Sequence, residues 1–165
     1  MENEIVSKLK NIIIFNDFKD DEEKLLKFSL IMKKEKFVAK DYIIKEGNVG
    51  DKLYILNKGS VKILRHTLNN EEYTVAIYND KENIFFGEVG LVDNERRSAS
   101  VIAETECEVF SVGRKDFLTL CEEDTLMGYK VILQIAKRIS STLRKMNRDV
   151  IILFEALVNE VNGEL

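Results

Sequence analysis

Proline is absent from this chain of 165 residues, and histidine occurs only once. Without proline, glycine and asparagine must form the turns. The single histidine, His66, argues against a metal centre or a catalytic site that needs two histidines. The two cysteines, Cys107 and Cys121, form no Cys-x-x-Cys pair, so we expect free thiols and no structural zinc.

Long hydrophobic runs and a positive net charge are also missing. The longest apolar stretch, residues 150–154, is far shorter than the roughly 20 residues of a membrane-spanning helix. Glu2 and Glu4 stand where a signal peptide is basic. The net charge of −4 provides no general attraction for nucleic-acid phosphates or anionic lipids. We therefore expect a cytoplasmic protein that binds neither nucleic acid nor membrane.

The sequence periodicity divides the chain into three regions. Residues 1–33 show helical spacing, with Asp20 as the expected cap of the second helix. Residues 34–113 contain short β-rich runs, separated by glycine, asparagine and aspartate, which predict an antiparallel sandwich or barrel. Residues 114–165 return to helical spacing, with a short helix at 115–121 and a long one at about 125–159. The predicted fold is mainly β, with N-terminal helices packed on a barrel and C-terminal helices as a lid.

The long C-terminal helix carries apolar residues alternately four and three positions apart. They are Ile132, Ala136, Ile139, Leu143, Met146, Val150, Leu153 and Leu157. This heptad spacing is typical of helices that pair in a coiled coil. A helix lying on its own barrel would show a similar stripe, and both arrangements can hold along one helix. The seam indicates a homodimer formed through this helix.

The segment 85–103 interrupts the strand pattern and contains groups that suit a sugar phosphate. Residues 87–91 predict a short helical turn entered through glycine, whose exposed N–H groups favour an anion. An arginine, Arg97, and hydroxyl groups follow a polar loop, and a carboxylate, Glu88, is available for a sugar hydroxyl. A purely structural ion pair between Glu88 and Arg97 accounts for the same residue types.

The order of these residues resembles the phosphate-binding cassette of the cyclic-nucleotide-binding domain family. The family includes the catabolite activator protein, the regulatory subunits of cAMP-dependent kinase and the cyclic-nucleotide-gated channels. The matching residues are Phe86, Gly87, Glu88, Val89, Gly90 and Leu91, followed by Arg97, Ser98, Ala99 and Ser100. Glu46-Gly47, Gly50-Asp51 and 53–55 match the family's upstream turns. The resemblance implies an antiparallel jelly-roll β-barrel with a short phosphate-binding helix.

The resemblance also implies roles for single residues in a ligand site. Arg97 would pair with the cyclic phosphate, and Glu88 would accept the ribose 2′-hydroxyl. Gly87 and Val89 would line the pocket through their backbone. Ser98 would offer its hydroxyl to the phosphate or to a guanine, so that cAMP and cGMP are both candidate ligands; Ala99 completes the binding segment.

Two positions depart from the family pattern. Gly90 replaces a common alanine, and we expect it to loosen the short helix, because glycine costs about 1 kcal/mol in a helix interior. Arg96 replaces a frequent proline, and we expect it to be solvated.

These features predict a non-catalytic sensor of cyclic mononucleotides, without metal or cofactor, that signals through its C-terminal helix to an effector protein not identified by the sequence. A metal-dependent cupin would need several histidines. A regulator of the catabolite-activator type would need a helix-turn-helix after the long helix, where about five residues remain. A channel fragment is a third alternative, although we expect a free-standing protein. The last alternative is a degenerate fold that serves assembly without nucleotide.

Overall fold

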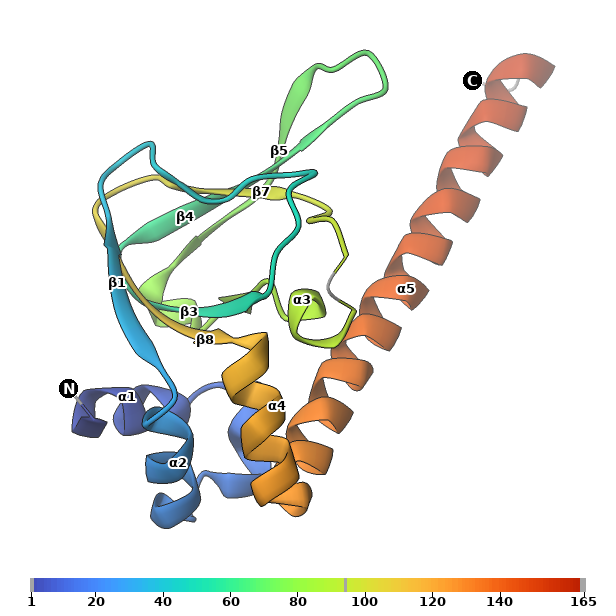
Figure 1. The fold of residues 1–165 in the computed structure, drawn as a ribbon. Coiled ribbons are helices and arrows are strands. Elements are labelled where there is room, and N and C mark those ends of the chain that lie inside the picture. Colours follow the sequence, from blue (N-terminus) through green and yellow to red (C-terminus); the bar gives the residue numbers. More distant parts are fainter. Residues whose placement is uncertain (1, 94, 164–165) are drawn as a thin grey trace. The chain divides into compact units, whose positions relative to one another are not determined.

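The computed structural model describes residues 2–93 and 95–163. They belong to two compact units, which meet in the sequence between Val131 and Ile132. The first unit contains all the strands and most of the helices (Figure 1). The sequence predicted three regions, 1–33, 34–113 and 114–165. These boundaries follow the change of secondary structure, and their use as domain boundaries stays a prediction.

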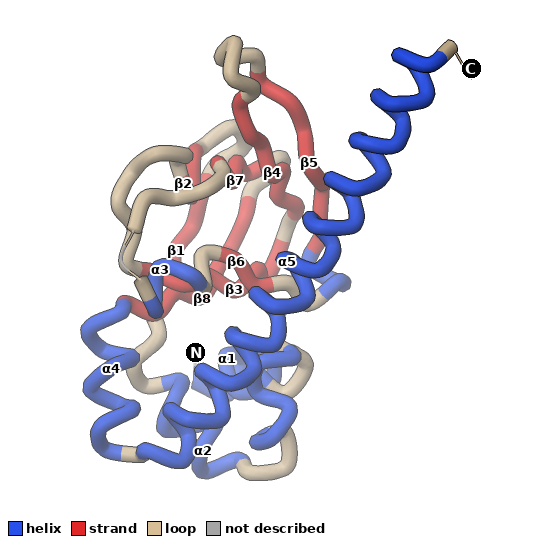
Figure 2. Tube along the Cα trace, turned by 90° about the vertical axis from the view of Figure 1, so that its right-hand side faces the viewer, coloured by secondary structure: helices blue, strands red, loops and turns tan. Residues whose placement is uncertain are grey.

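The first unit has two four-stranded antiparallel sheets, ordered β1-β8-β3-β6 and β2-β7-β4-β5. The strands are β1 (Lys33–Phe37), β2 (Tyr42–Ile44), β3 (Lys52–Lys58), β4 (Ser60–His66), β5 (Glu72–Asn79), β6 (Phe85–Phe86), β7 (Ser100–Ala103) and β8 (Cys107–Gly113). The sheets face one another (Figure 2). Their inward side chains, among them Leu56, Val61, Ala103 and Val109, are buried together in one core. The predicted mainly β, antiparallel fold is thus confirmed.

Helices α1 (Glu2–Leu9), α2 (Glu22–Ser29), α3 (Val89–Val92) and α4 (Arg114–Glu123) flank the sheets, with 3-10 helices η1 (Ile13–Phe18) and η2 (Asp80–Glu82). Helix α5 (Thr125–Asn162) begins in the first unit and continues through the second. Edge-to-face contacts between aromatic rings link these helices. The ring of Phe28 in α2 lies 4.6 Å from that of Phe15 in η1 and 6.3 Å from that of Phe117 in α4, measured between centroids. The cap of α2 is Asp21, which accepts the N–H of Lys24 at 3.1 Å, so the prediction of Asp20 was wrong by one residue.

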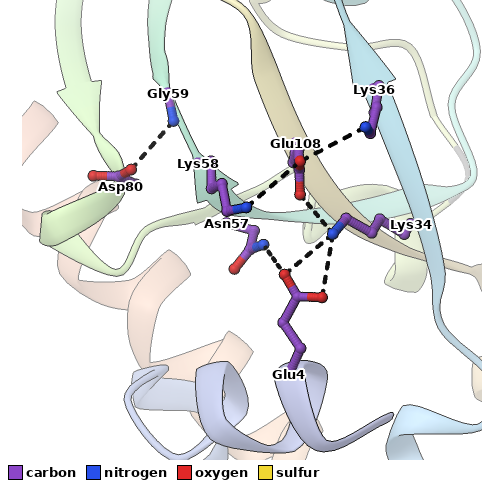
Figure 3. Close-up of polar contacts among 8 residues, drawn as sticks. All are labelled: Glu4, Lys34, Lys36, Asn57, Lys58, Gly59, Asp80 and Glu108. Atoms are coloured by element: carbon purple, nitrogen blue, oxygen red, sulfur yellow. Dashed lines mark hydrogen bonds and ion pairs between the residues drawn. The ribbon is translucent and has the colours of Figure 1, made fainter. Parts of the chain in front are cut away.

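Strand β1 was not predicted, because its sequence, Lys-Lys-Glu-Lys-Phe, lacks apolar alternation. Charge pairs take the place of apolar contacts along this edge strand. Lys34 lies between Glu4 of α1, at 3.1 Å, and Glu108 of β8, at 2.6 Å (Figure 3). Glu108 also lies 3.6 Å from Lys58, and the close contact with the Lys34 ammonium lowers the pKa of Glu108. Strand β1 therefore pairs with β8 through oppositely charged cross-strand neighbours.

Asp124 connects three helices through its backbone and its side chain. Its backbone N–H closes α4 on the carbonyl of Leu120, and its Oδ1 accepts the N–H of Met127 at 3.0 Å in the first turn of α5. Its Oδ2 lies 2.7 Å from Nζ of Lys24 in α2. The hydrogen bond from Lys24 lowers the pKa of Asp124 and raises the pKa of Lys24. This carboxylate sets the turn between α4 and α5.

Asp124→Ala is therefore expected to lower the free energy of unfolding by about 1–2 kcal/mol, the usual loss for a helix cap. Because the pKa of Asp124 is lowered by folding, this stabilisation is present above the unfolded pKa of about 4 and is lost at lower pH. Urea denaturation at pH 7 and at pH 3 measures both effects. Asp20→Ala, at an exposed position, is the control; equal losses in the two variants would contradict the capping role.

Candidate functional site

A left-handed glycine turn begins the site. Strand β6 pairs with β3 through Phe86 and Tyr54, whose rings stack at 5.6 Å between centroids. Gly87 follows with φ of +76°, a conformation that side chains with a Cβ rarely adopt. The chain then turns into α3, which Figure 1 shows beside β3. The predicted helical turn after Gly87 is confirmed, and it places Glu88 directly before α3.

Arg97 lies at the centre of the site. Its backbone pairs with the turn before β3, where its N–H donates to the carbonyl of Asn48 at 2.8 Å and its carbonyl accepts from Gly47 at 2.9 Å. Its guanidinium donates from Nη1 to the carbonyl of Gly87 at 2.9 Å and from Nη2 to the carbonyl of Lys52 at 2.7 Å. Arg97 thus joins the upstream turn, β3 and the start of the cassette.

The guanidinium of Arg97 is partly buried and remains charged. Burial lowers the pKa of Arg97, whereas the nearby groups of Tyr54, Asp51 and Glu88 act to raise it. An arginine keeps its proton in proteins, so the shift leaves a partly desolvated positive charge at this point. Such a charge is a strong partner for an anion.

Three glycines surround the guanidinium. A Cβ at Gly50 would overlap the Arg97 side chain, and a Cβ at Gly87 would lie 2.8 Å from Nη1. A Cβ at Gly90 would also lie 2.8 Å from Nη1 and would overlap the carbonyl oxygen of Gly50. The expectation that Gly90 merely loosens the helix overlooked this packing. Close approach of α3 to the Gly50 turn explains why glycine stands there.

A cavity of about 180 Å³ opens beside Arg97. It is lined by Ile43, Ile44, Lys45, Asn48, Val49, Gly50, Asp51, Lys52, Tyr54 and Arg97. Its volume is below the roughly 300 Å³ of the smallest common ligand pockets. The upstream glycine turn and the segment 53–55, which contains Tyr54, were recognised in the sequence, but neither Asn48 nor Lys52 was predicted to contact Arg97. No sequence signal marks Asn48 and Lys52, because their backbone carbonyls make the contacts.

The other predicted site residues occupy different environments. Glu88 is half-buried, Val89 and Ser98 are exposed, and Ala99 is half-buried. Ser100 is buried and its Oγ accepts the N–H of Glu46 at 3.0 Å, which is a structural contact. The structure brings Gly87 and Arg97 into direct contact; a role of each residue in ligand binding stays a prediction.

Arg96 is exposed, as expected, and donates to the carbonyl of Gly47 at 2.7 Å. Among the described residues, no three histidine, cysteine, aspartate or glutamate side chains are grouped so as to hold a metal ion. Within the same part of the chain, no helix is both long enough and apolar enough to span a membrane.

Comparison with known proteins identifies the family to which this chain is similar. The sequence model of the cyclic nucleotide-binding domain matches residues 34–124. The chain is 34% identical over 117 residues to the cAMP-activated global transcriptional regulator Vfr of Pseudomonas aeruginosa, covering 68% of this chain and 54% of that protein. It is 32% identical over 126 residues to the mouse hyperpolarization-activated cyclic nucleotide-gated channel 2, covering 72% of this chain and 14% of the channel.

Among solved structures, the regulatory domain of Toxoplasma gondii PKA, crystallised with cAMP, superposes with a TM-score of 0.71 at 28% identity. The match covers 85% of this chain and 50% of that one. The residues that the family model matches, 34–124, include strands of both sheets, the turn at Gly87 and Arg97, and they make up more than half of the chain. This chain belongs to the cyclic nucleotide-binding domain family.

Proposed function

We propose that this protein is a non-catalytic sensor of a cyclic mononucleotide, with cAMP as the favoured ligand. The observation that carries the proposal is the Arg97 guanidinium, a partly buried positive charge whose Nη1 and Nη2 donate to the neutral carbonyls of Gly87 and Lys52. A cyclic phosphate provides a negative charge and two acceptor oxygens in the geometry that arginine prefers. The cAMP-bound relative supports the same ligand.

Glu88 is the proposed partner of the ribose. Glu88 lies one residue after Gly87, and its charge acts on Arg97. The Glu88 carboxylate and the Arg97 guanidinium could therefore contact the same nucleotide. A carboxylate beside a phosphate site repels the anion unless it accepts a hydroxyl proton, and the 2′-hydroxyl provides one. The exposed hydroxyl of Ser98 leaves cGMP as a second ligand.

Signal output is proposed to pass through α5 to a homodimer or to an effector protein. Nucleotide binding would rearrange the Gly50 turn and α3, because both pack against the Arg97 side chain. Arg114 of α4 donates to the carbonyls of Leu91 and Val92, each at 3.2 Å, and so links α3 to the helix before α5. The alternative function is an assembly module of the same fold that does not bind nucleotide.

Calorimetric titration of cAMP and cGMP into protein refolded free of nucleotide tests the proposal. Arg97→Ala is expected to weaken binding by about 2–5 kcal/mol, or roughly 30- to 4000-fold, because it removes a partly buried charge partner. Arg96→Ala is the matched control, since the neighbouring arginine is exposed. Folded wild-type protein that binds neither nucleotide would support the assembly module instead.

The role of Glu88 is tested with 2′-deoxy-cAMP. The wild type should bind cAMP more tightly than the deoxy ligand by about 1.5–3 kcal/mol, or roughly 10- to 150-fold, the value of a hydrogen bond to a charged group. Glu88→Ala should bind both ligands equally. Glu95→Ala, an exposed acid in the same loop, should keep the preference. A preference that survives in Glu88→Ala would rule out the ribose contact.

Gly90→Ala tests the close packing of Gly50, Gly87 and Gly90 around the Arg97 guanidinium. The added Cβ would meet the carbonyl of Gly50 and the guanidinium, and overpacking of this kind lowers the free energy of unfolding by about 1–3 kcal/mol. Helix propensity alone would give the opposite sign, a gain of up to about 1 kcal/mol. Urea denaturation decides between them, with Val92→Ala at an exposed position of α3 as the control.

A further inference from the structure

The second unit, residues 132–165, presents an exposed apolar seam along α5. Leu143, Val150 and Leu153 are exposed by 57%, 64% and 69% of their surfaces. Ile139, Met146 and Leu157 continue the same seam and are also exposed. In heptad notation these residues occupy the a positions 143, 150 and 157 and the d positions 139, 146 and 153.

Charge is segregated along the same helix. Between residues 132 and 148 all the charged side chains are basic, and between 149 and 163 all are acidic. The basic ones are Lys137, Arg138, Arg144, Lys145 and Arg148, and the acidic ones are Asp149, Glu155 and Glu160. Apart from Asp149 at g and Glu160 at d, these charges occupy the outer b, c and f positions, so they act between two helices at longer range than the seam contacts. Two copies packed in parallel would place basic segment beside basic segment, and this repulsion is strongest at low salt. Antiparallel packing places basic beside acidic.

The heptad seam has a matching antiparallel register. When paired positions add up to 296, Ile139 meets Leu157 of a second copy, Leu143 meets Leu153, and Met146 meets Val150. Each layer then joins an a residue to a d residue, and the symmetry of the pair generates the other half of the seam. All of these layers lie within the second unit.

The positions that flank the seam also favour the antiparallel arrangement. In the antiparallel pair, the e positions of the two copies lie beside each other. The neighbouring pairs are then Phe154 with Ser140, Leu133 with Val161, and Asn147 with Asn147 of the other copy. In a parallel pair, e residues lie beside g residues, and Phe154 would contact Asp149 of the other chain. The antiparallel register has two unfavourable neighbours. Asp149 lies beside Asp149, next to the two Arg148 side chains, and Glu160, the d position after Leu153, lies opposite Ala136. In a parallel pair Glu160 would lie opposite Glu160 of the other chain.

From the seam, the charge segregation and the flanking residues, we infer that α5 pairs antiparallel with a second copy of this chain, about a two-fold axis near residue 148. This inference refines the homodimer of the proposed function and does not depend on nucleotide binding. The two chains then enter the pair at opposite ends, because each joins its first unit at Ile132. Nucleotide signals would reach the shared helices from both ends.

Thiol cross-linking distinguishes the two orientations. Ile139→Cys and Leu157→Cys are made separately on Cys121→Ser, with Cys107 left in place because it is buried. One variant carries a mass tag, and a short bis-maleimide is added to each protein alone and to an equimolar mixture. The antiparallel pair predicts cross-linked dimers in the mixture only, with one subunit of each mass. Dimers from either protein alone would show parallel helices and overturn the inference.

Sedimentation of the uncross-linked protein provides a second measurement. Self-association is expected to weaken as ionic strength rises, because salt screens the attraction between opposite charges. A parallel pair would instead associate more tightly at higher salt, because salt screens the repulsion between its like charges. A monomer at all concentrations would overturn the inference. Calorimetry with cAMP on the same samples shows separately whether the nucleotide site works, so failure of the pairing and failure of the sensor are distinguishable.

Discussion

The site depends on the two hydrogen bonds from the Arg97 guanidinium to the carbonyls of Gly87 and Lys52. They join three stretches of chain that are far apart in the sequence: the start of β3, the glycine turn before α3, and the loop that leads into β7. The approach is so close that Gly50, Gly87 and Gly90 leave no room for a Cβ. An arginine held by neutral carbonyls can exchange them for an anion, and any such exchange acts on all three segments.

Charge has a second, purely structural role at the opposite edge of the molecule. Strand β1 has almost no apolar side chains, yet it pairs with β8 along its full length. Lys34, Glu4 and Glu108 connect this strand to α1 and β8 in a partly shielded network (Figure 3). Exposed ion pairs each contribute little, so the backbone ladder and the core beneath it must supply most of the stability of this edge.

The two units of the chain bury apolar surface in different ways. The first unit covers its apolar side chains with its own sheets and helices, as the core around Leu56 and Val109 shows. The second is a helix whose seam residues are mostly exposed, and an exposed stripe of that length is typical of an interaction surface. In the proposed sensor, this division would keep ligand recognition in the first unit and leave the helix available for a partner.

The sequence by itself determined the mainly β fold, the helical ends, the seam of α5 and the cassette around Gly87 and Arg97, because periodicity and glycine-bearing motifs are local properties of the chain. Strand β1 was missed because charges replace its apolar pattern, and the cap of α2 was misplaced because two adjacent aspartates offer the same chemistry. Only the tertiary structure decided which groups hold Arg97. The carbonyls of Lys52 and Asn48 carry no residue-specific signal, and the need for glycine at position 90 arises from the Gly50 turn, forty residues earlier.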